Sequence, residues 1–287
     1  MRHLIRPLLV SASLSLPLLS QTTINSSDKY AYSANTGWIN AEADSTNGLV
    51  FAENLLSGYA YGANIGWIHF GDGTPDDLIA YGNDSSTDYG VNHDGLGNLT
   101  GQAYGANIGW ITFEQTHGQP RVDLSTGQFS GYAYGANIGW ISLSSLTTDS
   151  MTCPDSDNDG IADHYEQTHF GKLTTANATS NNDNDSQSDL AEYQANTDPT
   201  DSSSLLSLEL TYIDPSLDEV SLDITAGPGR YLTVEHDSTL TGLTSPTPAG
   251  SKTYNPLTIA GTFSDDFVFA TSAKRFFRLT TTKPLQP

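Results

Sequence analysis

Four copies of one ten-residue motif constrain the fold of this chain more than any other feature. The copies occupy residues 30–39, 59–68, 102–111 and 132–141, and each ends in Gly-Trp-Ile. All four tryptophans of the protein lie in this motif, 29, 43 and 30 residues apart. A repeat of this length indicates similar supersecondary units that pack against one another. We therefore predict a repeat domain over residues 28–146, with one insertion within residues 71–98.

Each copy is expected to form β-structure. A Tyr-Ala-Tyr strand precedes a turn in which Gly and Asn tolerate the left-handed backbone, and a Gly-Trp-Ile strand follows it. A further strand is expected before each unit, as at residues 121–124 before the last copy. Three short strands in about thirty residues indicate a β-solenoid or a sandwich built from the repeats, and the sequence leaves both open.

Alternation along the second strand separates two faces. The isoleucine of each copy shares its face with Phe70, Phe113 or Leu143 in the last three copies, whereas the tryptophan shares its face with polar residues. We expect the isoleucine face to be core and the tryptophan face to be partly solvated. A stripe of Tyr, Trp and Asn has the composition of a carbohydrate-binding surface. The other interpretation, that the rings wall the core between layers, is the commoner role of such residues.

Two acidic stretches, residues 155–166 and 181–192, arrange oxygen ligands as a calcium loop does. Positions 1, 3, 5 and 9 carry carboxylates or an amide, position 7 offers a backbone carbonyl, and the glutamate at position 12 can bind with both oxygens. The metal ligands we predict are Asp155, Asp157, Asp159, Ile161, Asp163 and Glu166, and Asn181, Asp183, Asp185, Gln187, Asp189 and Glu192. Two matches so close together are a strong signal for Ca²⁺.

The two loops depart from a standard EF-hand. Pro154 excludes a long incoming helix, although a short outgoing helix is expected after each loop. We expect Asp163 to cap the first helix, which Gly171 ends, and Ser188 to cap the second. The second loop is the weaker match, because Ser186 stands where the first loop has Gly160.

This pattern of alternating aspartates, with Thr-Asp-Pro after the second loop, resembles the thrombospondin type 3-like calcium repeats of secreted and surface proteins, chiefly bacterial ones. The resemblance covers residues 153–201 only and implies calcium at positions 1, 3, 5, 9 and 12 of both loops. The Trp-containing motif looks like repeats of exported bacterial proteins. Both resemblances imply export, and neither implies an activity.

Composition and the N-terminus agree with export. Residues 1–20 combine two arginines with an apolar stretch and read as a signal peptide, after which no segment is long enough to span a membrane. The net charge of −22 argues against nucleic acid or an anionic membrane as partner. The single cysteine, Cys153, excludes an intramolecular disulfide. We therefore place the protein outside the cell or at its surface.

The C-terminal region alternates apolar and polar residues in short runs. Residues 203–287 are predicted to form a small immunoglobulin-like β-sandwich, so the whole chain is expected to be mainly β with two short helices. No motif for nucleophilic, zinc or phosphate chemistry occurs in the sequence, and we do not expect an enzyme. The function predicted is that of an exported calcium-binding structural or adhesive protein; the alternative is carbohydrate binding through the Tyr/Trp face. The expected partners are an extracellular polysaccharide or another surface protein.

Overall fold

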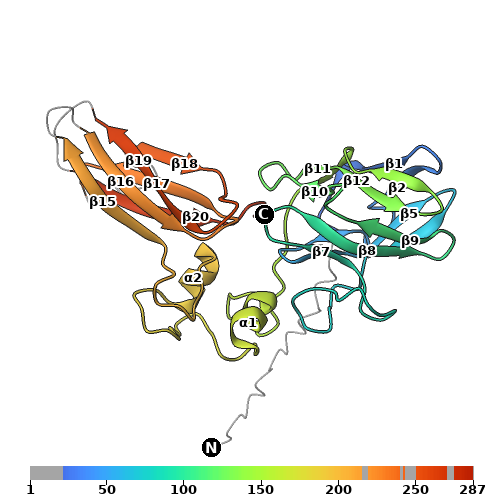
Figure 1. Ribbon diagram of the computed structural model, residues 1–287, viewed down its shortest axis with the longest axis horizontal. Helices are drawn as coiled ribbons and strands as arrows, with labels where there is room; N and C mark the ends of the chain where they lie inside the picture. Colours follow the sequence, from blue (N-terminus) through green and yellow to red (C-terminus); the bar gives the residue numbers. More distant parts are fainter. Residues whose placement is uncertain (1–21, 215–218, 240–241, 243–249, 270–274, 287) are drawn as a thin grey trace, which may run out of the picture.

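The computed structural model describes residues 22–286 except 215–218, 240–241, 243–249 and 270–274. The predicted signal peptide lies outside the described residues. The chain is mainly β, with a repeat domain at one side, a second group of strands at the other, and two short helices below and between them (Figure 1). Among the described residues, no helix is both long and apolar enough to cross a membrane.

The four motif copies fold into four β-hairpins that close into an eight-stranded antiparallel barrel. Each hairpin pairs with the next, and the last pairs with the first, through Tyr32 with Ser142 and Ser33 with Ile141. The barrel strands are β1 (Ile24–Ser33), β2 (Gly37–Asn40), β5 (Tyr59–Gly62), β6 (Gly66–His69), β8 (Leu99–Gly105), β9 (Gly109–Phe113), β12 (Tyr132–Gly135) and β13 (Gly139–Ser142). Shorter strands extend the sheet or pair beside it: β3 (Val50–Phe51), β4 (Leu55–Ser57), β7 (Val91–His93), β10 (Arg121–Val122), β11 (Phe129–Ser130) and β14 (Leu146–Thr148).

Closure corrects our expectation of a solenoid or a sandwich for this region. A solenoid would leave its first and last repeats with only one neighbour each, whereas here both have two. Pairing β13 with β1 removes the edge strands that an open array would present.

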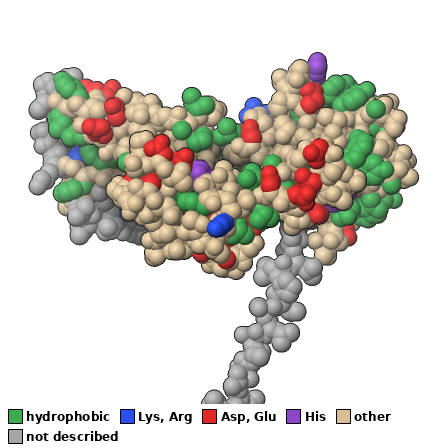
Figure 2. Space-filling view, turned by 60° about the horizontal axis from the view of Figure 1, so that its bottom comes forward, with side chains coloured by type: hydrophobic (Ala, Val, Ile, Leu, Met, Phe, Trp, Pro, Cys, Tyr) green, Lys and Arg blue, Asp and Glu red, His purple; other side chains and the backbone are tan. Residues whose placement is uncertain are grey.

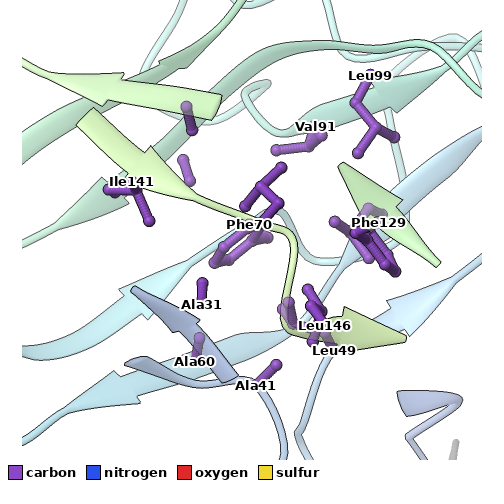
Figure 3. Packing of buried hydrophobic residues seen from close by; sticks show 14 of the residues in the cluster. Ala31, Ala41, Leu49, Ala60, Phe70, Val91, Leu99, Phe129, Ile141 and Leu146 are labelled. Atoms are coloured by element: carbon purple, nitrogen blue, oxygen red, sulfur yellow. The ribbon is translucent and has the colours of Figure 1, made fainter. Parts of the chain in front are cut away.

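The barrel interior is filled by the alternating residues of each hairpin. The alanine of Tyr-Ala-Tyr and the isoleucine of Gly-Trp-Ile point inward and are buried: Ala31, Ala60, Ala103 and Ala133, with Ile39, Ile68, Ile111 and Ile141. Larger side chains, among them Phe70 and Phe129, complete the same core (Figure 3). The predicted isoleucine face is thus confirmed as core.

The packing within each turn explains why the first copy differs from the others at two positions. A Cβ on Gly62 would lie 2.6 Å from the Ile65 side chain of its own turn, and the third and fourth copies show the same crowding. The first copy carries Ser33 at this position and the smaller Thr36 where the others have isoleucine. The larger residue at one position is therefore accompanied by a smaller one at the other. Each turn then ends in a glycine at positive φ, such as Gly66 at 81°, which is costly for other residues.

A ring of asparagine side chains joins the four turns. The Nδ2 of each motif asparagine donates to a backbone carbonyl of the preceding hairpin, over 2.9 to 3.1 Å. The donor and acceptor pairs are Asn64 to Thr36, Asn107 to Ile65, Asn137 to Ile108, and Asn35 to Ile138. The last pair joins the first hairpin to the fourth, so the ring closes as the barrel does.

The C-terminal region forms two three-stranded antiparallel sheets. Their orders are β15-β16-β19 and β18-β17-β20, and residues of β16, β17 and β19 share one apolar core. The strands are β15 (Ser207–Asp214), β16 (Glu219–Ala226), β17 (Tyr231–Asp237), β18 (Gly250–Tyr254), β19 (Gly261–Val268) and β20 (Phe276–Thr282).

Candidate metal centre and the junction around it

Each acidic loop leads into a short helix. Helix α1 (Asp163–Phe170) begins after Ala162, which has no side-chain cap, so Asp163 is its first residue and not the cap we predicted. Gly171 ends α1 in the left-handed conformation, as expected. Helix α2 (Asp189–Ala195) is capped by Ser188, whose hydroxyl accepts from the Ala191 amide, which confirms that prediction.

The first loop gathers three of its five predicted carboxylate ligands around one point, and Asp163 and Glu166 are not in that group. Oxygens of Asp155, Asp157 and Asp159 lie within 4.8 Å of one another. Asp155 also accepts hydrogen bonds from the Asn158 amide at 2.7 Å and the Gly160 amide at 2.9 Å, which fold the loop back on itself. Gly160 adopts φ of 98°, which explains why this position is glycine.

The second loop does the same without a glycine. Oxygens of Asp183, Asp185 and Glu192 lie within 4.8 Å of one another. Asn184 adopts φ of 61°, and Asn158 at the same place in the first loop adopts 60°. Asparagine tolerates this conformation better than most residues, so the two loops turn at equivalent points. Ser186 is not among the residues at positive φ.

Several oxygens of the two loops are buried without a hydrogen-bond partner in the described part of the chain. Glu166 and Glu192 are both 0 % exposed, and both carboxylate oxygens of Glu166 and one of Glu192 have no partner there. The other such loop oxygens belong to Asp159, Asn181, Asp183 and Asp185. Burying an unpaired carboxylate is expensive unless a cation compensates it. These oxygens therefore fit a hard cation and no ligand of negative charge.

The electrostatics of both loops agree with this geometry. Burial, together with the charges of Asp159 and Asp157, raises the pKa of Glu166 from 4.5 to about 8. Burial, together with Asp183 and Asp185, raises the pKa of Glu192 from 4.5 to about 8. Each glutamate therefore holds a proton far more readily than an exposed glutamate does, because burial and the neighbouring aspartates disfavour a further negative charge.

Asp163 and Asp189, predicted at position 9, have another role in this structure. The Asp163 carboxylate accepts from the Ser156 amide at 2.7 Å and from its hydroxyl. Asp189 accepts from the Asn182 amide at 3.0 Å in the same way. Both residues are buried, and each ties the start of its loop to the start of its helix. They position the loops, and direct ligation by them stays a prediction.

The two position 7 residues also make contacts of their own. The Ile161 side chain packs in an apolar cluster with Tyr165 and Tyr193, which joins the two helices. The Gln187 side chain donates to the Leu206 carbonyl at 2.7 Å, at the entrance to the C-terminal sheets. Ligation through the backbone carbonyls of both residues stays a prediction.

The junction between the repeat barrel and the rest of the chain centres on Glu53, which sequence reasoning missed. Its buried carboxylate lies 2.6 Å from Arg230 Nη2, 3.1 Å from Lys283 Nζ and 2.9 Å from the Tyr193 hydroxyl. His164 Nε2 lies 4.0 Å away. Glu53 is one of 33 acidic residues, and its partners are all distant along the chain, so no sequence pattern identifies it.

These contacts hold Glu53 ionised. Burial raises its pKa, but the positive charges of Arg230 and Lys283 outweigh burial and lower the pKa well below its usual range. Arg230, itself buried, also donates to the backbone carbonyls of Tyr193 and Gln194 on α2. The Glu53 junction thus connects the barrel, both helices and the C-terminal sheets.

The end of the chain returns to the barrel beside this junction. The Met151 amide donates to the Leu285 carbonyl at 2.9 Å, and Leu285 packs against the barrel core. Cys153 lies 3.7 Å from Lys283 Nζ, and burial raises the pKa of its thiol, which disfavours the reactive thiolate.

Comparison with protein-family models, curated proteins and solved structures gave no match to this chain.

Proposed function

We propose that this is an exported structural or adhesive protein in which two calcium ions bind residues 155–166 and 181–192. The observation that carries the proposal is the complete burial of Glu166, whose two carboxylate oxygens find no partner among the described residues. A bidentate glutamate at position 12 is the ligand that closes a calcium loop around its ion.

The donor set favours calcium over other cations. Each cluster offers carboxylate oxygens, and the buried amide oxygen of Asn181, at position 1 of the second loop, has no partner among the described residues. Zinc prefers nitrogen and sulfur, but the nearby imidazole of His164 faces Glu53. Calcium accepts six to eight oxygens in flexible geometry, whereas magnesium retains water and demands a regular octahedron.

Calcium would act through the junction. Glu166 and His164 both belong to α1, and Glu192 and Tyr193 are neighbours in α2. Because His164 and Tyr193 contact Glu53, an ion that fixes the two helices would also fix the barrel relative to the C-terminal sheets. The metal would thus set the shape of the whole protein.

The proposed location and role rest on other features. The signal peptide and the calcium-repeat resemblance support a place outside the cell or at its surface. We further propose that the C-terminal sheets are an immunoglobulin-like spacer, because their orders β15-β16-β19 and β18-β17-β20 correspond to A-B-E and C′-C-F of such sandwiches. Adhesion to another surface protein fits this arrangement.

Calorimetric titration of the metal-free protein with calcium tests the proposal. We expect binding of two ions and a higher melting temperature at about 5 mM calcium, since extracellular modules bind at around 10⁻⁴–10⁻³ M. Glu166→Gln should abolish one site and Glu192→Gln the other. Asp76→Asn, which changes an exposed acid of the insertion, should leave both sites intact. Absence of any binding heat and of any stabilisation would contradict the proposal.

A further inference from the structure

The outer wall of the barrel carries the same aromatic pair four times. In every hairpin a tyrosine ring lies 4.8 to 4.9 Å from the tryptophan ring, at an interplanar angle of 57° to 58°. We call these rings the aromatic girdle: Tyr32 and Trp38, Tyr61 and Trp67, Tyr104 and Trp110, and Tyr134 and Trp140. Four copies with one geometry indicate rigid platforms.

The girdle is exposed. The tryptophans are 42 % to 55 % exposed, although the isoleucine that follows each of them is buried. Figure 2 shows hydrophobic side chains gathered over the outer side of the barrel. The rings therefore do not wall the core between layers, and keeping them in water forgoes the gain from burying large apolar surfaces.

The third copy shows that the aromatic surface is maintained by other means where the motif changes. Gln102 stands there in place of the first tyrosine of the motif. Tyr89, from the insertion, places its ring 4.9 Å from Trp110. The Tyr89 hydroxyl bonds His69 Nδ1 at 2.7 Å, and His69 lies 4.6 Å from the Tyr59 ring. Tyr59, His69, Tyr89 and Trp110 thus form one continuous strip across the second and third hairpins.

The chemistry of the wall identifies a class of ligand. Of the eight barrel strands, only β1 contains Asp, Glu, Lys or Arg. Within the seven other barrel strands, the polar neighbours of the rings are hydroxyl, amide or imidazole groups, such as Thr112 and Ser142. One carboxylate, that of Asp72, lies near His69 and Tyr89. A protein of net charge −22 would repel an anionic polymer. Aromatic faces beside neutral hydrogen-bonding groups suit a ligand with apolar C–H faces and many hydroxyls.

We propose that the aromatic girdle binds a neutral polysaccharide, and that the strip across the second and third hairpins is its principal site. The Tyr89 ring is nearly perpendicular to its neighbours His69 and Trp110, at 82° and 88°, so sugar units stack on the rings of the strip that turn a face outward, and the polar groups between them bind the sugar hydroxyls. Because the four pairs face outward from different sides of a closed barrel, one straight chain cannot reach them all. The protein therefore joins separate polysaccharide chains. This site is distinct from the calcium loops, so it extends the proposed function without depending on it.

Electrophoresis of the full chain through native gels that contain a polysaccharide tests the proposal. The probes are a β-glucan, a galactomannan and a dextran, with alginate as the anionic comparison, each with calcium and with chelator. At least one neutral polymer should retard the protein in both conditions, whereas alginate should not. Reading both conditions separates failure of this proposal from failure of calcium binding.

Variants locate the site. Trp67→Ala with Trp110→Ala should weaken retardation by about tenfold or more, since linked sites gain affinity together. Tyr89→Ala should weaken it as well. Tyr212→Ala, which removes an exposed ring from the C-terminal sheets, is the matched control and should have no effect.

Fluorescence of the unaltered protein gives a second measurement that needs no variant. All four tryptophans lie in the girdle, so the polymer that binds should protect their emission from acrylamide. Retardation by no neutral polymer, or retardation unchanged in the double Trp variant, would overturn the proposal. A concentration-dependent dimer that the same substitutions dissociate would also overturn it and assign the girdle to a second copy of the chain.

Discussion

The Glu53 carboxylate and the Arg230 guanidinium, 177 residues apart in the chain, meet at 2.6 Å and are almost wholly buried. Glu53 lies between β3 and β4 of the barrel domain, and Arg230 immediately precedes β17 of the C-terminal sheets. Lys283 and the Tyr193 hydroxyl complete the set around Glu53. Since Glu53 belongs to the barrel, Tyr193 to α2, and Arg230 and Lys283 flank the C-terminal sheets, these contacts form only when the three parts are packed together.

Removing one member of this pair should be strongly destabilising. We expect Glu53→Ala to lower the free energy of unfolding by about 3–5 kcal/mol, because Arg230 would be left buried and unpaired. Urea unfolding measures the change. Glu42→Ala, which breaks a partly exposed pair with Lys29, is the control and should have a much smaller effect. A loss of unfolding free energy after Glu53→Ala no larger than the loss after Glu42→Ala would mean that the Glu53 junction does not stabilise the fold.

The stability of the calcium-free protein should fall as the pH rises toward about 8. The pKa values of Glu166 and Glu192 rise from 4.5 in the unfolded chain to about 8 in the folded protein. The folded state therefore holds more protons between these values, and the stabilisation by bound protons is lost as pH rises through about 8. Buried His93 and His164 have lowered pKa values, so their contribution to the stability of the fold is lost only on acidification.

The melting temperature of chelated protein, measured from roughly pH 7 to pH 8.5, checks this expectation. It should decrease over that range, and Glu166→Gln with Glu192→Gln should flatten the dependence. Calcium should flatten it too, because the ion replaces the protons. A melting temperature that rises with pH in chelator would show that the two glutamates are not protonated in the fold.

The asparagine ring should contribute to barrel stability at each of its four positions. Asn137→Ala removes the 2.9 Å bond to the Ile108 carbonyl and should cost about 1 kcal/mol. Asn35→Ala should cost a similar amount, although its bond joins the two ends of the repeat domain. Asn47→Ala, which removes a 2.8 Å bond from the exposed Asn47 side chain to the Asp44 carboxylate, is the comparison. Unchanged urea midpoints for both ring variants would argue against a stabilising ring.

Neighbouring residues of β9 should differ sharply in their effect. Ile111→Ala should destabilise by about 2–5 kcal/mol, as buried isoleucines do, because the side chain lies inside the barrel. Trp110→Ala should cost clearly less than the roughly 3–5 kcal/mol typical of a core aromatic. Chemical unfolding of both variants makes the comparison. A larger loss for Trp110 than for Ile111 would show that the girdle is part of the core.

Local pattern predicted the units of this fold but not their assembly. The hairpins, the inward isoleucines and the Ser188 cap follow from neighbouring residues, whose spacing fixes their faces. Barrel closure depends on the pairing of β1 with β13. The four hairpins are too similar in sequence to indicate which hairpin pairs with which. The Glu53 junction was inaccessible for a similar reason, since its members share no local pattern.

The candidate metal centre was the most predictable site because its candidate ligands lie within one short loop of the sequence. The gathering of Asp155, Asp157 and Asp159 follows from loop spacing alone. The hydrogen bonds of Asp163 to Ser156 depend on how tightly the loop folds back, and a ligand pattern does not encode that.

Closure of the barrel also bears on how such a chain can evolve. An open stack can gain or lose a unit by duplication or deletion, because each new unit needs only one existing neighbour. Here a fifth hairpin would have to enter a circle whose strand number and diameter are linked. Changing the number of copies would therefore change the diameter of the barrel and the packing of its interior. New sequence is accommodated instead between hairpins, as in the segment that supplies Tyr89.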